Sequence, residues 1–263
     1  MLKRELKINF KTFAIWTSIL LGIFLVVFLL YPSIVSDQNI EMLNEMIKIF
    51  PEEMLKAFNM DISSIDTAFG WLKTEGFVFI LLITGCYAGI LGSNILLKEE
   101  NDQTIEYLNG LPVSRTEILL KKYLAGLIYV LSLIGITIIF NYACLLLSGD
   151  FNQKQYFLLS LTPIFSSIVI YSLCFFLATF THKTKKMLGI SLGIVFVSYV
   201  FQIFSSISES TEFLKYFSIF TLSDIRYVIE NISINYINIL LSIILSIILL
   251  SASLVRYKHK ELI

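Results

Sequence analysis

Charge is the feature that this sequence has least of. Charged residues make up 15% of its 263 residues, whereas soluble domains carry roughly 25%. Hydrophobic residues account for 56%, and the mean hydropathy is +0.79. The charges gather between long stretches that contain none, and charge-free stretches of about 20 residues are typical of membrane-spanning helices. The composition therefore indicates an integral membrane protein and excludes an ordinary soluble domain.

Several kinds of reactive group are also missing. The three cysteines, Cys86, Cys144 and Cys174, lie in apolar stretches without metal-ligand spacing. An odd number of cysteines in such places argues against a disulfide framework and favours simple packing roles. No clustered ligands or catalytic groups stand out, so we expect no catalytic residue, metal or cofactor in this chain. Glu99-Glu100 would open an intramembrane-protease motif, but Thr104 stands where that motif needs Arg.

Sources of transport energy are absent in the same way. No glycine-rich phosphate loop occurs, so the chain is not expected to bind ATP by itself. Transport driven by an ion gradient usually requires ionisable side chains within the membrane, and the apolar stretches hold none. These absences argue against a self-sufficient ATP-driven pump.

Six stretches are long enough to cross a bilayer. None contains Lys, Arg, Asp or Glu, and we expect each to form one helix of an all-α integral membrane protein. The predicted spans are residues 13–31, 76–97, 123–147, 156–180, 187–207 and 234–255. Two long connections, 32–75 and 208–233, are expected on the outer side. Pro163 predicts a late start or a kink in the fourth span. We treat residues 1–263 as a single transmembrane domain.

Lys and Arg are distributed unequally across the predicted membrane. Six spans put both termini and the connections 98–122 and 181–186 on one side, which carries fourteen of the 20 Lys and Arg residues. Asp and Glu favour the other side, which holds thirteen of 20. Because basic residues are retained in the cytoplasm, both termini are predicted to be cytoplasmic. The expected location is a cell membrane, in a bacterium.

Two amphipathic patterns flank the first span. Four apolar residues on one helical stripe, with lysines beside it, predict an N-terminal interfacial helix along the cytoplasmic head groups; they are Leu2, Leu6, Phe10 and Phe13. A simple positively charged flank of the first span explains this pattern equally well. Residues 42–58 predict one or two amphipathic helices at the outer surface.

Uncharged polar side chains within the predicted spans are candidates for lining a translocation path. They are Asn94, Asn141, Tyr142, Tyr171, Tyr199, Gln202 and Asn238. The alternative is hydrogen bonding between helices, worth roughly 1 kcal/mol each, and it is the more common role of such groups. Small residues spaced four apart predict close-packed helix faces: Gly85 with Gly89, Ala88 with Gly92, and Gly189 with Gly193.

The connection 98–122 is far longer than two neighbouring spans need. Gly110 and Pro112 interrupt it and leave a short predicted helix over 104–109. After Pro112, Ser114 and Glu117 fit a capping box, in which each side chain bonds the backbone amide of the other. We expect this short helix to dock into a cytoplasmic partner; a helix lying on lipid is the alternative.

The same stretch, "EENDQTIEYLNGLPVSRTEILLKKYLAG", resembles the connection between the second and third spans of ABC-2 type transporter permeases. Thr104-Ile105-Glu106, Leu108, Pro112-Val113-Ser114-Arg115, Glu117-Ile118 and Lys122 match the usual family pattern. Gln103 and Gly110 depart from it. In that family this connection holds a coupling helix that sits in a groove of a separate ATPase subunit. The resemblance implies coupling residues at Thr104, Ile105, Glu106, Tyr107, Leu108, Gly110, Pro112 and Arg115.

The resemblance implies a non-catalytic permease subunit of an ATP-driven exporter. Its partners would be an ABC ATPase, which binds the ATP and Mg²⁺, and a second permease copy or a paralogue; no nucleic acid is expected. The Met- and Phe-rich outer segment favours a hydrophobic peptide, antimicrobial or drug as substrate. An uncoupled channel or secondary carrier is the alternative, and a membrane enzyme would need catalytic groups that the sequence lacks.

Overall fold

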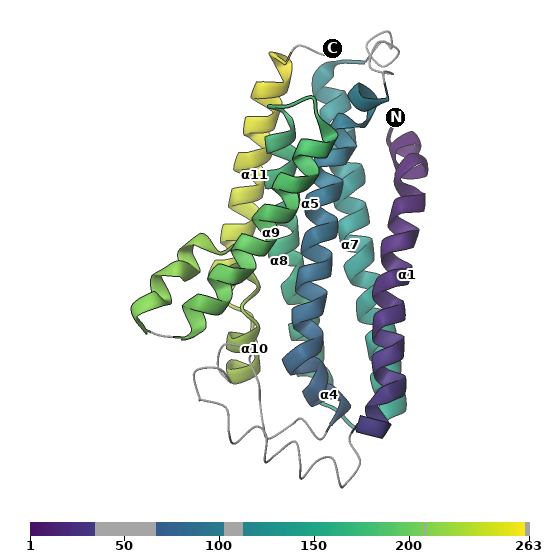
Figure 1. The fold of residues 1–263 in the computed structure, drawn as a ribbon, viewed down its shortest axis with the longest axis vertical. Coiled ribbons are helices and arrows are strands. Elements are labelled where there is room, and N and C mark those ends of the chain that lie inside the picture. The colour runs from purple at the N-terminus through teal and green to yellow at the C-terminus, as the bar shows by residue number, and fades with distance from the viewer. Residues whose placement is uncertain (35–66, 103–112, 208, 261–263) are drawn as a thin grey trace.

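The computed structural model describes residues 1–34, 67–102, 113–207 and 209–260, and all regular elements in these ranges are helical. Its six longest helices are the body of the molecule (Figure 1): α1 (Leu2–Ile34), α5 (Phe77–Asn101), α7 (Arg115–Ser148), α8 (Gln153–Ala178), α9 (Thr184–Ile207) and α11 (Tyr236–Lys258). Each forms, or forms most of, a segment long and apolar enough to cross a membrane. The six predicted spans therefore correspond to six helices, in the predicted order.

The termini of the described chain lie together. The beginning of α1 and the end of α11 occupy the same end of the bundle in Figure 1, which we call the termini end. An even number of crossings requires this, because each helix reverses the direction of the one before it.

The first helix differs from the prediction of a separate interfacial segment. α1 runs unbroken from Leu2 to Ile34, so an N-terminal helix that turns before the membrane is not present. Residues 2–12 contain neither Gly nor Pro to end a helix. Leu2, Leu6 and Phe13 pack against the protein core instead of lipid, and the Tyr129 hydroxyl donates a hydrogen bond to the carbonyl oxygen of Leu6.

The second membrane helix begins earlier than predicted. α4 (Ala68–Trp71) and the π-helix η2 (Leu72–Gly76) lead directly into α5, so placing residues 68–75 in a connection was wrong. Thr67 caps α4 by accepting a hydrogen bond from the Gly70 amide at 3.0 Å. The predicted boundary followed the charges of Lys73 and Glu75, yet Lys73 is buried and its Nζ lies 5.6 Å from the Phe69 ring centroid.

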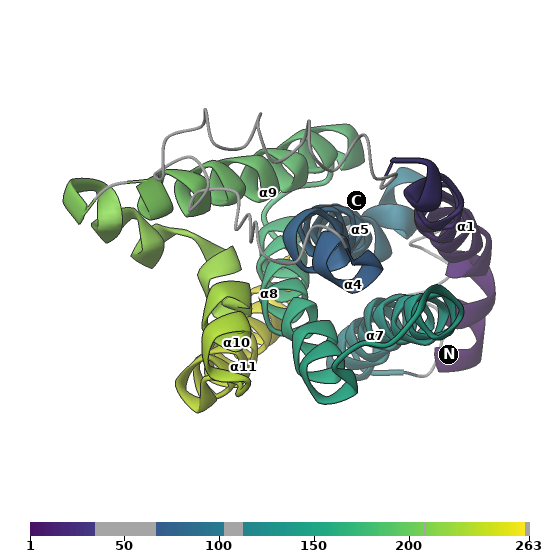
Figure 2. The ribbon, with the colours of Figure 1, turned by 90° about the horizontal axis from the view of Figure 1, so that it is seen from below.

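The centre of the molecule is α5. It packs mainly against α8 and α9 and is flanked by α1 and α7, as the view along the bundle shows (Figure 2). A Cβ at Gly92 would meet the carbonyl oxygen of Tyr171 at 2.5 Å, so glycine there allows α5 and α8 to approach closely. Gly85 and Gly89 also lie against α8 side chains. The predicted close-packed face of α5 is confirmed.

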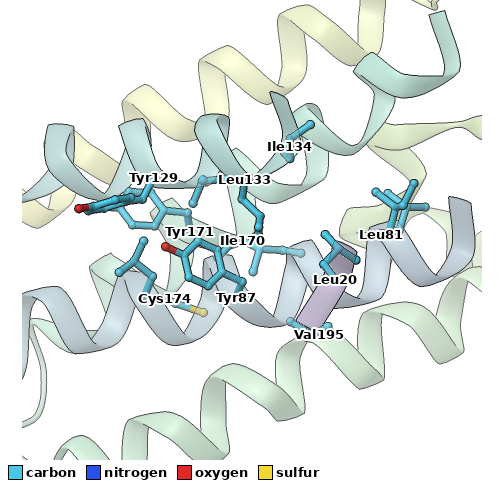
Figure 3. Packing of buried hydrophobic residues seen from close by; sticks show 14 of the residues in the cluster. Leu20, Leu81, Tyr87, Tyr129, Leu133, Ile134, Ile170, Tyr171, Cys174 and Val195 are labelled. Atoms are coloured by element: carbon cyan, nitrogen blue, oxygen red, sulfur yellow. The ribbon is translucent and has the colours of Figure 1, made fainter. Parts of the chain in front are cut away.

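The core behind this contact has two kinds of side chain. Figure 3 shows Tyr87, Tyr129, Tyr171 and Cys174 gathered toward one end, with Leu20, Leu81 and Val195 toward the other. Aliphatic residues fill space without needing partners, whereas each buried tyrosine hydroxyl must find one. Buried polar groups that need hydrogen-bond partners are therefore concentrated at the tyrosine end of the core.

The fourth membrane helix continues on both sides of its proline. The prediction of a late start was wrong, because α8 begins at Gln153 with Asn152 as its N-cap. Pro163 lies inside α8, and near it the Ser223 hydroxyl enters the backbone ladder. That hydroxyl donates to the Thr162 carbonyl at 2.5 Å and accepts from the Ser166 amide at 3.2 Å. A side chain from another segment thus bonds the backbone of α8 beside its proline.

Ser223 belongs to a helical return in the second predicted outer connection. This return consists of η3 (Glu209–Phe217), η4 (Ile219–Ser223) and α10 (Ile225–Asn231). At its middle, Ser218 donates a hydrogen bond to the Ser198 carbonyl of α9 at 2.7 Å. The return is therefore fastened to both α8 and α9. The amphipathic helices predicted within 42–58 lie outside the described residues.

Candidate functional site

A buried ion pair joins the two helices that precede and follow residues 103–112. Glu99 stands near the end of α5 and Lys122 about two turns into α7, with side chains 4% and 1% exposed. Lys122 donates to a Glu99 carboxylate oxygen at 2.5 Å and to the Ile95 carbonyl at 2.7 Å. The Glu5 carboxylate of α1 lies 3.6 Å from the same ammonium group. One lysine therefore ties α1, α5 and α7 together at the termini end.

A second buried pair joins α5 to the C-terminus. Lys260 donates to Glu100 at 2.7 Å and to the carbonyl of Thr181, between α8 and α9, at 2.8 Å. His182 Nδ1 lies 2.7 Å from the other Glu100 oxygen. Burial lowers the pKa of Lys260, although its bond to Glu100 acts in the opposite direction. Glu100 thus connects α5 to the α8–α9 turn and to the end of the chain.

Sequence reasoning missed these groups because it counted them as solvated loop charges. The signal that could have found Lys122 is its setting, since Leu119, Leu120, Tyr123 and Leu124 surround it in the sequence. A lysine in such a run either points to the membrane surface or is buried with an acidic partner. Only the packing of α5 beside α7 decides between the two.

The predicted capping box is half confirmed. Ser114 caps α7 by accepting a hydrogen bond from the Glu117 amide at 3.2 Å. The carboxylate of Glu117 bonds Lys121 in place of the Ser114 amide.

Of the residues assigned to coupling, Arg115 alone lies within the described chain. It is exposed, and its guanidinium donates to the carbonyls of Lys258 and Lys260, at 3.3 and 3.0 Å. Thr104, Ile105, Glu106, Tyr107, Leu108, Gly110 and Pro112 lie outside the described residues. Arg115 thus connects the start of α7 to the C-terminus, as Glu100 does from α5.

The candidate path residues are not brought together within one chain. Tyr171 is buried and donates to the Tyr123 carbonyl at 3.0 Å, and Tyr142 stacks among aromatic rings of α8. Gln202 and Asn238 meet through Thr221, which bonds the Gln202 side chain at 2.8 Å and the Asn238 side chain at 3.3 Å. These four make the contacts expected of groups that join helices.

The other three candidates have different surroundings. Asn141 is buried, and its side-chain oxygen has no hydrogen-bond partner. Asn94 lines a cavity of about 210 Å³ near the termini end, between α1, α5 and the start of α9. Tyr199 lines a groove of about 260 Å³ between α5, α9 and the helical return. Burial raises the pKa of Asp224, which lines the same groove.

The fold and this site define a class of protein: a polytopic α-helical membrane protein with two buried ion pairs at one end of six helices. Comparison with protein families makes the assignment more specific. The family model described as ABC-2 family transporter protein matches residues 13–262. The chain therefore belongs to the ABC-2 transporter family, whose members are permease components of membrane transport systems. No curated protein and no solved structure matches the chain.

Proposed function

We propose that this chain is the membrane subunit of an ATP-driven exporter, that it works as a pair of permeases with two ATPase subunits, and that residues 104–112 dock onto the ATPase. The family match over residues 13–262 carries the proposal, because permeases of this family usually work with an ABC ATPase. The ATPase supplies the chemistry of ATP and Mg²⁺, and this chain supplies the path.

The buried pair of Glu99 and Lys122 supports this coupling role. These residues stand on opposite sides of the 103–112 segment, and their side chains bond each other. A displacement applied to that segment would therefore move the end of α5 and the start of α7 as one unit. Because Lys122 also faces Glu5, the displacement would reach α1 as well.

One face of α9 supports the pairing of permeases. Met187, Ser191 and Val195 face the interior, while Gly189 and Gly193 are exposed on the other side. A Cβ at either glycine would meet nothing within 4 Å. Small residues four apart let two membrane helices approach closely, so this face suits a second permease copy or a paralogue.

The substrate is proposed to be a hydrophobic peptide, antimicrobial or drug. This part rests on the Met- and Phe-rich sequence of residues 42–58. A cytoplasmic position of both termini, in a bacterial cell membrane, belongs to the same proposal.

The proposal is tested by purifying the tagged chain together with the ATPase it is expected to need. The pair should hydrolyse ATP in a vanadate-sensitive way, whereas the chain alone should neither bind nor hydrolyse ATP. Truncating a buried aromatic anchor at an interface costs about 2 kcal/mol or more, roughly thirtyfold in affinity. Tyr107→Ala should therefore release the ATPase, and Tyr236→Ala, an exposed tyrosine on α11, should not.

Two results would reject this function. One is ATP binding by the isolated chain at micromolar concentration. The other is full ATPase association by a variant carrying both Tyr107→Ala and Glu106→Ala, which would instead favour an uncoupled channel or carrier.

A further inference from the structure

The cavity between α1, α5 and the start of α9 has an unusual polar lining. Its walls include Trp16 of α1, Tyr87, Asn94 and Lys98 of α5, Asp102 just after α5, and Thr184 of α9. Tyr87 and Asp102 are fifteen residues apart, which corresponds to about 22 Å along a helix. The lining therefore runs from the termini end of α5 well into the bundle.

Three polar atoms of this lining are buried without a hydrogen-bond partner. They are the Tyr87 hydroxyl, the Asn94 side-chain oxygen and the Thr184 hydroxyl. Tyr87 is 1% exposed, so bulk water does not satisfy it. Leaving such an atom without a partner destabilises the fold, and native structures keep few of them. Of five such atoms among the described residues, three line this one cavity, which indicates a ligand that supplies their partners.

The lining changes character along its length. At the termini end it carries the ammonium group of Lys98 and the carboxylate of Asp102. Asn94 lies farther in, and its oxygen only accepts hydrogen bonds. Deepest are the rings of Trp16 and Tyr87, with centroids 5.8 Å apart. This lining matches an amphipath whose head group has both signs of charge and an N–H donor.

The helices on either side show where such a molecule would come from. Only 11% of the most apolar part of α1 and 22% of that of α9 is buried within the chain. The cavity therefore adjoins two helices whose other surfaces are left for the bilayer. We propose that it binds one membrane lipid with a primary-amine zwitterionic head group, whose ammonium donates to the Asn94 oxygen and the Tyr87 hydroxyl and whose phosphate accepts from Lys98 and the Thr184 hydroxyl. This site does not depend on the proposed ATPase coupling.

The chain carries its own reporter for this site. Its two tryptophans are Trp16 and Trp71, and Trp71 lies in α4, toward the other end of the bundle. In a Trp71→Phe background, Trp16 is the sole tryptophan. The full chain in phosphatidylcholine nanodiscs is given increasing fractions of lipid with brominated acyl chains, which quench tryptophan on contact. Brominated phosphatidylethanolamine should quench Trp16 at lower fractions than the two brominated control lipids. These are phosphatidylcholine, whose head group has no N–H, and phosphatidylglycerol, whose head group has no amine.

Two variants separate a binding role from a structural one. Tyr87→Phe and Asn94→Leu remove groups without partners in the chain, so neither should lower the thermal stability of the detergent-purified protein. Each should reduce the preference for phosphatidylethanolamine by about fivefold, the change expected for one hydrogen bond. Tyr171→Phe is the matched control, because it removes a bonded hydroxyl and should lower stability without changing the preference.

Three outcomes would overturn the assignment. Equal quenching by all three lipids would mean that water fills the cavity. Stronger quenching by phosphatidylglycerol would assign it to an anionic head group held by Lys98. An unchanged preference in both Tyr87→Phe and Asn94→Leu would place the lipid elsewhere on α1.

Discussion

Lys122 shows how much one residue can hold at the end of a membrane bundle. It is the common partner of Glu5 on α1 and Glu99 on α5, and all three are almost fully buried. Moving an ion from water into the protein interior costs free energy, and the attraction of its partner offsets that cost only while the pair stays together. The adjacent Lys121 offers a direct contrast, because it is exposed and pairs with Glu117 one turn away on the same helix.

Lys122→Met is expected to destabilise the fold by about 3–5 kcal/mol, because it leaves two buried carboxylates without their cation. Lys121→Met should cost at most about 0.5 kcal/mol, as for other surface helix pairs. Unfolding in mixed detergent micelles, followed by tryptophan fluorescence, measures both. Lys122→Met combined with Glu99→Gln should recover part of the loss; equal stability of the two single variants would contradict the ion-pair account.

At the scale of elements, glycines decide which helices touch. Gly92 faces a backbone carbonyl of α8, whereas Gly189 of α9 faces open space. Gly92→Ala should therefore force α5 and α8 apart and reduce both stability and folded yield. Gly189→Ala should leave the single protomer as stable as before or slightly more, because alanine favours helix. Thermal unfolding of the two proteins in the same detergent decides, and a mild effect at Gly92 would show that the helices readjust.

The helical return is attached to α8 by a side chain. Ser223→Ala removes the hydroxyl that bonds both Thr162 and Ser166 and leaves those two buried backbone groups unsatisfied. A loss of about 1–3 kcal/mol is expected, with faster hydrogen exchange in η4 and in α8 around Pro163. Ser205→Ala is the control, since the Ser205 hydroxyl bonds a carbonyl of its own helix. Unchanged exchange around Pro163 would mean that α8 closes its own ladder there.

At the scale of the whole molecule, the distribution of Lys and Arg predicts which end faces the cytoplasm. In a chain without its native cysteines, Asp150→Cys and Lys215→Cys should react with an impermeant maleimide added to intact cells. Lys183→Cys and Lys185→Cys, in and next to the turn between α8 and α9, should react only after the cells are opened. The reverse pattern would invert the topology and place residues 103–112 outside.

The sequence alone was sufficient for the number and order of the membrane helices and for the family. Both depend on local patterns: charge-free stretches about as long as a bilayer is thick, and a short motif after the second of them. The Ser114 cap is local in the same sense, and it was found where expected. The early start of the second membrane helix was missed because Lys73 was taken to mark a boundary, although it lies in a helix and is buried.

Tertiary structure decided what no local pattern contains. Whether Lys122 and Glu99 face water or each other depends on α5 and α7 lying side by side, and the two residues are 23 positions apart. Tyr171, Gln202 and Asn238 form separate bonds between segments because each helix turns a different face to its neighbours. Tyr87, Asn94 and Thr184 share a cavity for the same reason. Which side chains are buried depends on how the helices pack, and the hydropathy of the sequence does not contain that information.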